Sequence, residues 1–235
     1  MTRAYAAFER LEVKDKAKRV KYLRNLSNIS HKLQENDKTI EYATEVSIHA
    51  LTDDDRGFAY GLIGLSYRLK GEYDKAIGYY EKSLAIYLKA LGAEHPSVGT
   101  SYNNIGSAYR LKGEYDKAIQ YLEKSLAIRL KTRGAEHPDI GQSYSNIGLA
   151  YKAKGEYDKA IGYYEKDLAI SLKALGAEHP SVGTSYLNLG AAYNAKGDKT
   201  KAMAYLLKAK AIYLKKLGPQ HPNTKAVQSW IDDLK

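Results

Sequence analysis

Cysteine is absent from this sequence, and proline, phenylalanine and tryptophan are scarce, at five, two and one among 235 residues. Without cysteine the chain can form no disulfide, no zinc site with thiolate ligands and no cysteine nucleophile. No stretch approaches the ~18 consecutive apolar residues that a membrane-spanning helix needs, and the first residues lack the apolar run of a signal peptide. These absences fit a reducing compartment, and we expect a cytoplasmic protein.

Acidic residues are scarce near the two ends of the chain, which carries a net charge of +10. Residues 1–24 contain eight Lys or Arg and three acids, and residues 183–224 contain seven Lys and one Asp. Such an excess of positive charge attracts acidic partners, which include acidic proteins, nucleic acid and anionic lipid. Nucleic acid is not expected as a partner, because the sequence contains no recognised nucleic-acid-binding motif.

Glycine, in contrast, is frequent and regularly placed. The segment Gly-Glu-Tyr-Asp-Lys-Ala begins at Gly71 and recurs unchanged at Gly113 and Gly155, with a degenerate copy at Gly197. A second segment, Gly-Ala-Glu-His-Pro, recurs with the same spacing of 42 residues. A fixed period of this length predicts stacked structural repeats, which form long surfaces rather than closed pockets. The repeat therefore favours binding over catalysis.

Each repeat is predicted to form two helices. From Tyr102 to Tyr109, apolar residues recur at the spacing of one helix face. Gly113 interrupts the pattern, which then resumes for about four turns until Gly134 stops it. Pro138 suits the first turn of the next helix, where its missing N–H is no loss. Neither helix is apolar enough to stand alone, so we expect an all-α fold whose core comes from stacking.

Small and large residues of the repeat occur in the order of a known signature. They resemble the tetratricopeptide signature at Tyr102, Ile105, Gly106, Tyr109, Ala118 and Leu122. The 42-residue period exceeds the 34 residues usual in that family. With His-Pro before the first helix and Asn-Ile-Gly within it, the pattern is similar to the kinesin light chain repeats. The resemblance implies a right-handed α-solenoid of about five helical hairpins with an extra helix at each end.

The resemblance also implies how the chain is divided. Residues 57–224 are predicted to form four 42-residue repeats, and residues 20–56 align as a degenerate repeat before them. Residues 1–19 are predicted to form an N-terminal helix. Residues 225–235, which contain the single tryptophan, Trp230, are predicted to form a capping helix.

Four histidines recur with the repeat and raise the question of a metal site. They are His95, His137, His179 and His221. Successive layers of helices lie about 10 Å apart, which is too far for two histidines to share an ion bound at ~2 Å. We therefore predict that the histidines form turns. The sequence shows no phosphate-binding loop and no nucleophile–base pair, so we expect no enzyme activity, no catalytic residues, no metal, no cofactor and no small-molecule substrate.

In tetratricopeptide arrays the first helix of each repeat lines a concave surface, and the resemblance implies such a groove here. Asn104, Asn146 and Asn188 recur on that helix and resemble the asparagines with which the family holds a peptide backbone, because an amide can both donate and accept hydrogen bonds. Cationic residues on the same helices would bind acidic side chains or a carboxylate. The predicted partner-binding groove comprises Arg68, Asn103, Asn104, Arg110, Asn146, Lys152 and Asn188. The alternative is that duplication has repeated solvated surface positions.

The last repeat departs from the others in charge. It has uncharged residues at the positions where the preceding repeat has Asp158, Glu165 and Glu178. A terminal repeat is expected to be atypical, because one of its faces meets solvent, but this does not by itself account for the loss of three acids. We predict a basic contact surface for an acidic partner, formed by Lys199, Lys201, Lys208, Lys215 and Lys216.

These features predict a non-catalytic adaptor or scaffold that binds another protein. The resemblance extends to bacterial kinesin light chains and implies association with the cytoskeleton, because such proteins are associated with bacterial tubulins, whose filaments offer acidic surfaces. One alternative is a general peptide-binding repeat protein with an unrelated acidic partner. Another is attachment to anionic membranes through Tyr5, Phe8 and Leu11, which have helical spacing among basic residues. We favour the interpretation that these three side chains pack an N-terminal helix on the first repeat.

Overall fold

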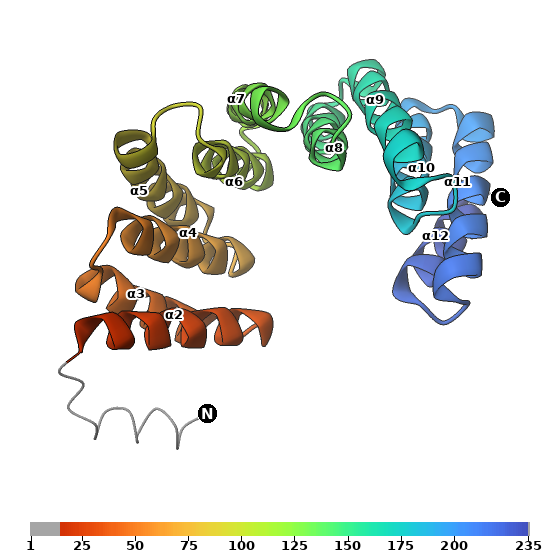
Figure 1. The fold of residues 1–235 in the computed structure, drawn as a ribbon. Coiled ribbons are helices and arrows are strands. Elements are labelled where there is room, and N and C mark those ends of the chain that lie inside the picture. The colour runs from red at the N-terminus through yellow and green to blue at the C-terminus, as the bar shows by residue number, and fades with distance from the viewer. Residues whose placement is uncertain (1–14, 235) are drawn as a thin grey trace. The chain divides into compact units, whose positions relative to one another are not determined.

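The computed structural model describes residues 15–234, and every regular element among them is a helix (Figure 1). The chain divides into two compact units, Met1–Lys112 and Gly113–Lys235. The first unit contains α2 (Lys16–Lys32), α3 (Asn36–His49), α4 (Asp53–Leu69), α5 (Tyr73–Leu91) and α6 (Pro96–Lys112). The second contains α7 (Tyr115–Arg133), α8 (Pro138–Lys154), α9 (Tyr157–Leu175), α10 (Pro180–Lys196), α11 (Lys199–Leu217) and α12 (Pro222–Asp233). The predicted all-α class is confirmed. Tyr5, Phe8 and Leu11 lie outside the described residues.

The helix boundaries follow the glycines and prolines of the repeat. α7 ends at Arg133, and its C-cap is Gly134, where the backbone has a φ of 82° that residues with a side chain rarely adopt. α8 then begins at Pro138, as predicted. Within each unit, helices that follow one another in sequence pack against each other, so that α4 lies on α5, α8 on α9 and α10 on α11. Within residues 15–234, no helix is both long enough and apolar enough to cross a membrane.

The small residues of the signature lie where two helices approach closely. Ala160 is fully buried, together with Ile161 and Tyr164 of α9, against α10. A Cβ atom added at Gly148 would lie 2.7 Å from the Tyr164 ring, and one at Gly64 in the first unit would lie 2.7 Å from its Tyr80 counterpart. At such distances a side chain would force the tyrosine ring to shift, so the close packing of the two helices depends on these glycines.

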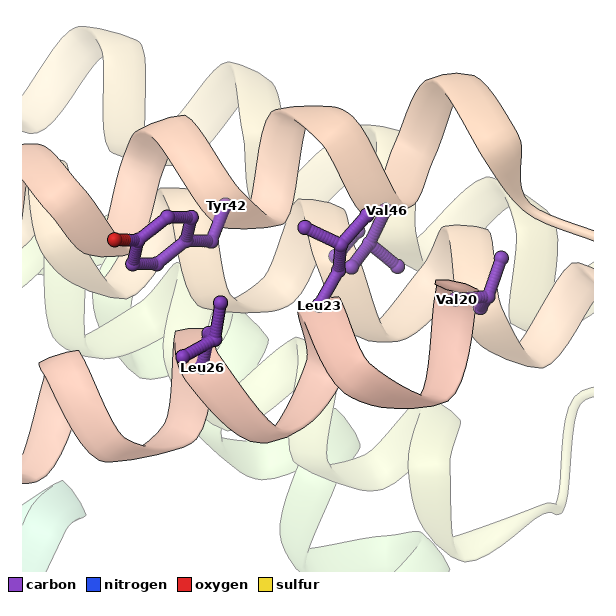
Figure 2. Packing of buried hydrophobic residues seen from close by; sticks show 6 residues of the cluster. Val20, Leu23, Leu26, Tyr42 and Val46 are labelled. Carbon is purple, nitrogen blue, oxygen red and sulfur yellow. The ribbon is translucent and has the colours of Figure 1, made fainter. Parts of the chain in front are cut away.

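The degenerate repeat of α2 and α3 keeps the apolar core of a hairpin. Val20, Leu23 and Leu26 of α2 lie against Tyr42 and Val46 of α3, and all five are buried (Figure 2). Burial of this apolar surface is the main force that holds the two helices together.

The linker after this repeat supplies its own helix cap. The Thr52 side chain accepts a hydrogen bond from the Asp55 N–H, and the Asp55 side chain accepts one from the Thr52 N–H, which together form a capping box at the start of α4. Arg24 of α2 donates to the Asp55 carboxylate at 2.6 Å, so this buried acid is paired with a cation.

The repeated Gly-Glu-Tyr-Asp-Lys-Ala segment lies at the turn between the two helices of a hairpin and contributes two kinds of ion pair. Its glutamate pairs with its own lysine, as Glu72 does with Lys75 at 2.5 Å. Its aspartate pairs with a lysine at the end of the next first helix, as Asp74 does with Lys112 at 2.6 Å. These pairs are exposed and each contributes little stability, but the aspartate–lysine pairs link consecutive hairpins in both units.

Candidate functional site

The repeated histidines cap helices. Nδ1 of His137 accepts a hydrogen bond from the Asp139 N–H at 3.1 Å, and Nδ1 of His179 accepts one from the Ser181 N–H at 3.1 Å. His95 and His221 make the same contact at 3.2 Å. Each therefore satisfies one of the N–H groups that the start of a helix leaves unpaired. Among residues 15–234 no group of three or more His, Cys, Asp or Glu side chains could hold a metal ion.

Two of the predicted groove residues lie together in the second unit. Asn146 of α8 and Asn188 of α10 line one hollow of about 470 Å³. The Asn188 amide donates to the Ser145 hydroxyl at 3.0 Å, which links the first helices of two neighbouring repeats. Asn104 lines a smaller hollow of about 250 Å³ in the first unit, beside Tyr87.

The other predicted groove residues lie elsewhere. Arg68, Asn103, Arg110 and Lys152 are half-buried and line neither of these two hollows. Arg68 is close to the Tyr80 hydroxyl. Burial raises the pKa of Tyr80, and the charge of Arg68 acts in the opposite direction. The guanidinium group of Arg68 therefore interacts with the second helix of its own hairpin.

A buried carboxylate that sequence reasoning missed forms part of the hollow in the second unit. Asp167 of α9 is 6% exposed and lines the hollow together with Asn146 and Asn188. The Ser185 hydroxyl donates to Asp167 Oδ2 at 2.8 Å, and the Ser171 hydroxyl donates to Oδ1 at 3.3 Å. Burial raises the pKa of Asp167 to about 6, although these hydroxyl groups act in the opposite direction. A comparison between repeats could have found this residue, because the equivalent position is Ser in the two preceding repeats and Ala in the following one.

The lysines of the predicted basic surface are all exposed, and they extend along α11. Lys199 and Lys216 are 17 residues apart, which corresponds to roughly 25 Å along a helix. Lys201 lies over the ring of Tyr193 at 5.1 Å from its centroid, and Lys208 lies over that of Tyr205 at 5.3 Å. The surface is therefore a ridge along one helix, with two of its cations held against aromatic rings.

The end of the ridge is partly neutralised from within the chain. Lys215 and Lys216 both pair with Glu178, which precedes α10, and the distance from Lys216 Nζ to Glu178 Oε2 is 3.0 Å. Hydrogen bonds from these two lysines lower the pKa of Glu178 to about 2. Lys201 is paired as well, with Asp198 at 3.5 Å.

The three acids that the last repeat lacks face the next repeat in the preceding copy. Asp158 pairs with Lys196, Glu178 pairs with Lys215, and Glu165 lies near Tyr205, so each acid faces the next repeat along the chain. Beyond α11 the described chain forms only the short helix α12, which offers no such partner hairpin. This arrangement gives the loss of the three acids a structural reason besides a contact surface, and the predicted basic surface stays a prediction.

Comparison with known proteins identifies the repeats. The sequence matches the tetratricopeptide repeat family over residues 55–131, 98–173 and 139–215. A comparison with curated proteins found no match.

Solved structures with the same fold include two of kinesin light chain type. BtubC (BKLC) from P. vanneervenii is 26% identical, with a TM-score of 0.78 over 94% of this chain and 91% of that one. The kinesin light chain TPR-like repeats from Podosopora anserina are 29% identical, with a TM-score of 0.70 over 83% of this chain and 97% of that one. The apo form of RapI, at 15% identity and a TM-score of 0.68 over 98% of this chain and 88% of that one, shares the fold alone. The resemblance to kinesin light chain repeats is confirmed, and the chain belongs to the tetratricopeptide repeat family.

Proposed function

We propose that the protein is a non-catalytic adaptor that binds a filament of the bacterial tubulin type through the basic ridge on α11. The observation that carries this proposal is the similarity to BtubC (BKLC) along 94% of the chain. Tetratricopeptide repeats mediate protein–protein interactions, so a protein partner follows from the family. The finer assignment to a tubulin-like filament comes from bacterial kinesin light chains, whose association with bacterial tubulins we extend to this chain.

The charge of α11 supports an acidic partner. This helix contains six lysines and no acid, whereas α9 contains three lysines and three acids. Fields from exposed charges steer a partner of opposite sign and weaken as salt is added, because the Debye length falls to ~10 Å at 0.1 M. Cations held over tyrosine rings lose less conformational freedom on binding than free lysines do.

A pair of matched variants tests the ridge. Lys201→Glu with Lys208→Glu reverses two charges on α11, and Lys159→Glu with Lys166→Glu makes the same change 42 residues earlier, where the lysines also lie over tyrosine rings. We expect the α11 variant to lose salt-sensitive co-sedimentation with tubulin-like filaments and the α9 variant to retain it. If both variants sediment like the wild type, α11 is not the contact.

We also propose that the asparagines hold an extended segment of the protein partner. Asn146 and Asn188 line the same hollow, and Asn104 lines the corresponding hollow of the first unit. Replacing these three asparagines with alanine should weaken binding of the partner while circular dichroism remains unchanged. Unchanged affinity in a helical variant would exclude this role.

A further inference from the structure

The hollow of the second unit exists because two positions of α9 differ from the other repeats. Where α5 has Tyr87, α7 has Arg129 and α11 has Tyr213, α9 has the much smaller Ser171. Those tyrosine rings fill the space above a glycine of the preceding helix, so closely that a Cβ atom at Gly57 or Gly183 would lie 2.7 Å from the ring. The glycine is retained in α8 as well, but no ring covers it.

The Asp167 side chain occupies part of the vacated space. Its Oδ1 atom would lie 2.8 Å from a Cβ atom at Gly141, the α8 counterpart of Gly57 and Gly183, and Ser171 Oγ would lie at 3.6 Å. The remaining volume is the hollow of about 470 Å³, compared with about 250 Å³ in the first unit, where Tyr87 and Ser83 stand at the two positions. The exchange therefore opens a cavity and places a carboxylate in its wall.

The Asp167 carboxylate has unused capacity to accept hydrogen bonds. An ionised carboxylate offers about four acceptor sites, and two hydroxyl groups contact this one. The Ser185 hydroxyl, which carries a single proton, is also within 3.1 Å of the Ser181 carbonyl oxygen. Asp167 thus has at most two donors within the chain.

No cation of the described residues pairs with Asp167. The residues that line the hollow include no Lys, Arg or His, and the other charged one, Asp139, is itself paired with Arg133 at 3.1 Å. The other buried acid of the described chain, Asp55, has Arg24 at 2.6 Å. Buried charges in proteins are normally paired, so Asp167 lacks the partner that Asp55 has.

We propose that this hollow binds the ammonium group of a lysine side chain, from an extended segment of the partner protein, with the Asp167 carboxylate as its charged acceptor. The inference rests on the peptide groove proposed above. Leu149 and Leu175 line the same hollow and would contact the methylene groups of the lysine. The Asn146 and Asn188 amides lie at its wall, where the peptide backbone would pass. The raised pKa of Asp167 is consistent with a carboxylate that has no cation beside it.

The test uses the full chain and a short peptide. The peptide acetyl-Ala-Ala-Lys-Ala-Ala-amide is compared with the same peptide carrying norleucine, which has the aliphatic chain without the ammonium group, and with n-butylammonium, which has no backbone. Binding is followed by the NMR shifts of the Asn146, Asn188 and Ser185 amides at 0.15 M salt. We expect the lysine peptide to bind at least tenfold more tightly than either of the other two probes.

Two variants copied from the neighbouring repeats test the site itself. Asp167→Ser introduces the residue found at positions 83 and 125, and Ser171→Tyr introduces the residue found at 87 and 213, so both should fold. Asp167→Ser should remove the preference for lysine over norleucine, and Ser171→Tyr should abolish binding of both peptides by filling the cavity. Equal affinity of the lysine and norleucine peptides for the wild type, or an unchanged preference in Asp167→Ser, would overturn the proposal. Binding of n-butylammonium as tight as that of the peptide would overturn the assignment to a peptide side chain. The assay contains no filament, so its result is separate from the co-sedimentation result.

Discussion

Burial of the Asp167 carboxylate should make the stability of the second unit depend on pH. Burial raises the pKa of this group from 3.8 to about 6, against the effect of the Ser185 and Ser171 hydroxyls. Asp139 of α8 is the other charged residue that lines the hollow. Asp167→Asn removes the charge and leaves an oxygen that can accept from Ser185. We therefore predict that this substitution stabilises the protein at neutral pH.

The size of the effect follows from the two pKa values. A carboxyl group whose pKa is higher in the folded state holds its proton more tightly when folded, so the free energy of unfolding falls as the pH rises between the two values. At 1.36 kcal/mol per unit, a change from 3.8 to about 6 corresponds to roughly 3 kcal/mol. The destabilisation is absent below about pH 4 and complete above about pH 7. Asp167→Asn should therefore add ~3 kcal/mol more to the free energy of unfolding at pH 8 than at pH 4.

Urea unfolding of the wild type and the variant at pH 4, 6 and 8 measures this difference. Repeat arrays can unfold in more than one step, so hydrogen exchange of the α9 and α10 amides should locate the change. Asp158→Asn is the control, because Asp158 is 78% exposed and pairs with Lys196, and its loss should give no stabilisation at pH 8. An Asp167→Asn effect of the same size at pH 4 and pH 8 would refute the argument from burial.

Two further predictions concern the stability of the helical hairpins. Gly148→Ala should destabilise the protein by roughly 1–3 kcal/mol, because the added Cβ would lie 2.7 Å from the Tyr164 ring. Gly162→Ala should stabilise it by up to ~1 kcal/mol, because its Cβ would have no atom within 4 Å and alanine favours the helix. Thermal denaturation should therefore show shifts of opposite sign. His179→Ala should lower stability by ~1 kcal/mol, because the Ser181 N–H loses its acceptor. His179→Asn should retain most of that stability, and equal losses in the two variants would argue against capping.

The hairpins could be predicted from the sequence because their determinants are local and repeated. Gly134 and Pro138 mark a helix end and a helix start whatever the rest of the chain does. The close approach of Gly148 to Tyr164 follows from the same pattern, since both residues recur at fixed positions of the signature. The histidines were correctly placed in turns, but their role as caps became clear only from the contact between Nδ1 and a backbone N–H.

The contacts between repeats could not be predicted in the same way. Lys215 pairs with Glu178, 37 residues earlier, and a lysine beside another lysine does not indicate which acid it faces. Asp167 follows Lys166 in a helix of alternating charges and resembles a solvated residue in sequence. Its burial comes from its contacts with Ser185 of α10 and with the backbone of α8 at Gly141, which are tertiary features.

Departures from a repeat do not all carry the same information. The acids absent from the last repeat are those that face the next repeat in the preceding copy, and no such hairpin follows α11 within the described residues. The repeat of α8 and α9 is different, because α9 packs against α10 of the following repeat. Its sequence changes therefore cannot be explained by a position at the end of the array. There, two positions one helical turn apart differ from every other repeat: Asp167 places a buried charge, and the small Ser171 leaves a hollow. A buried charge without a partner destabilises the fold, so its presence in an inner repeat points to a ligand more strongly than the exposed lysines of α11 do.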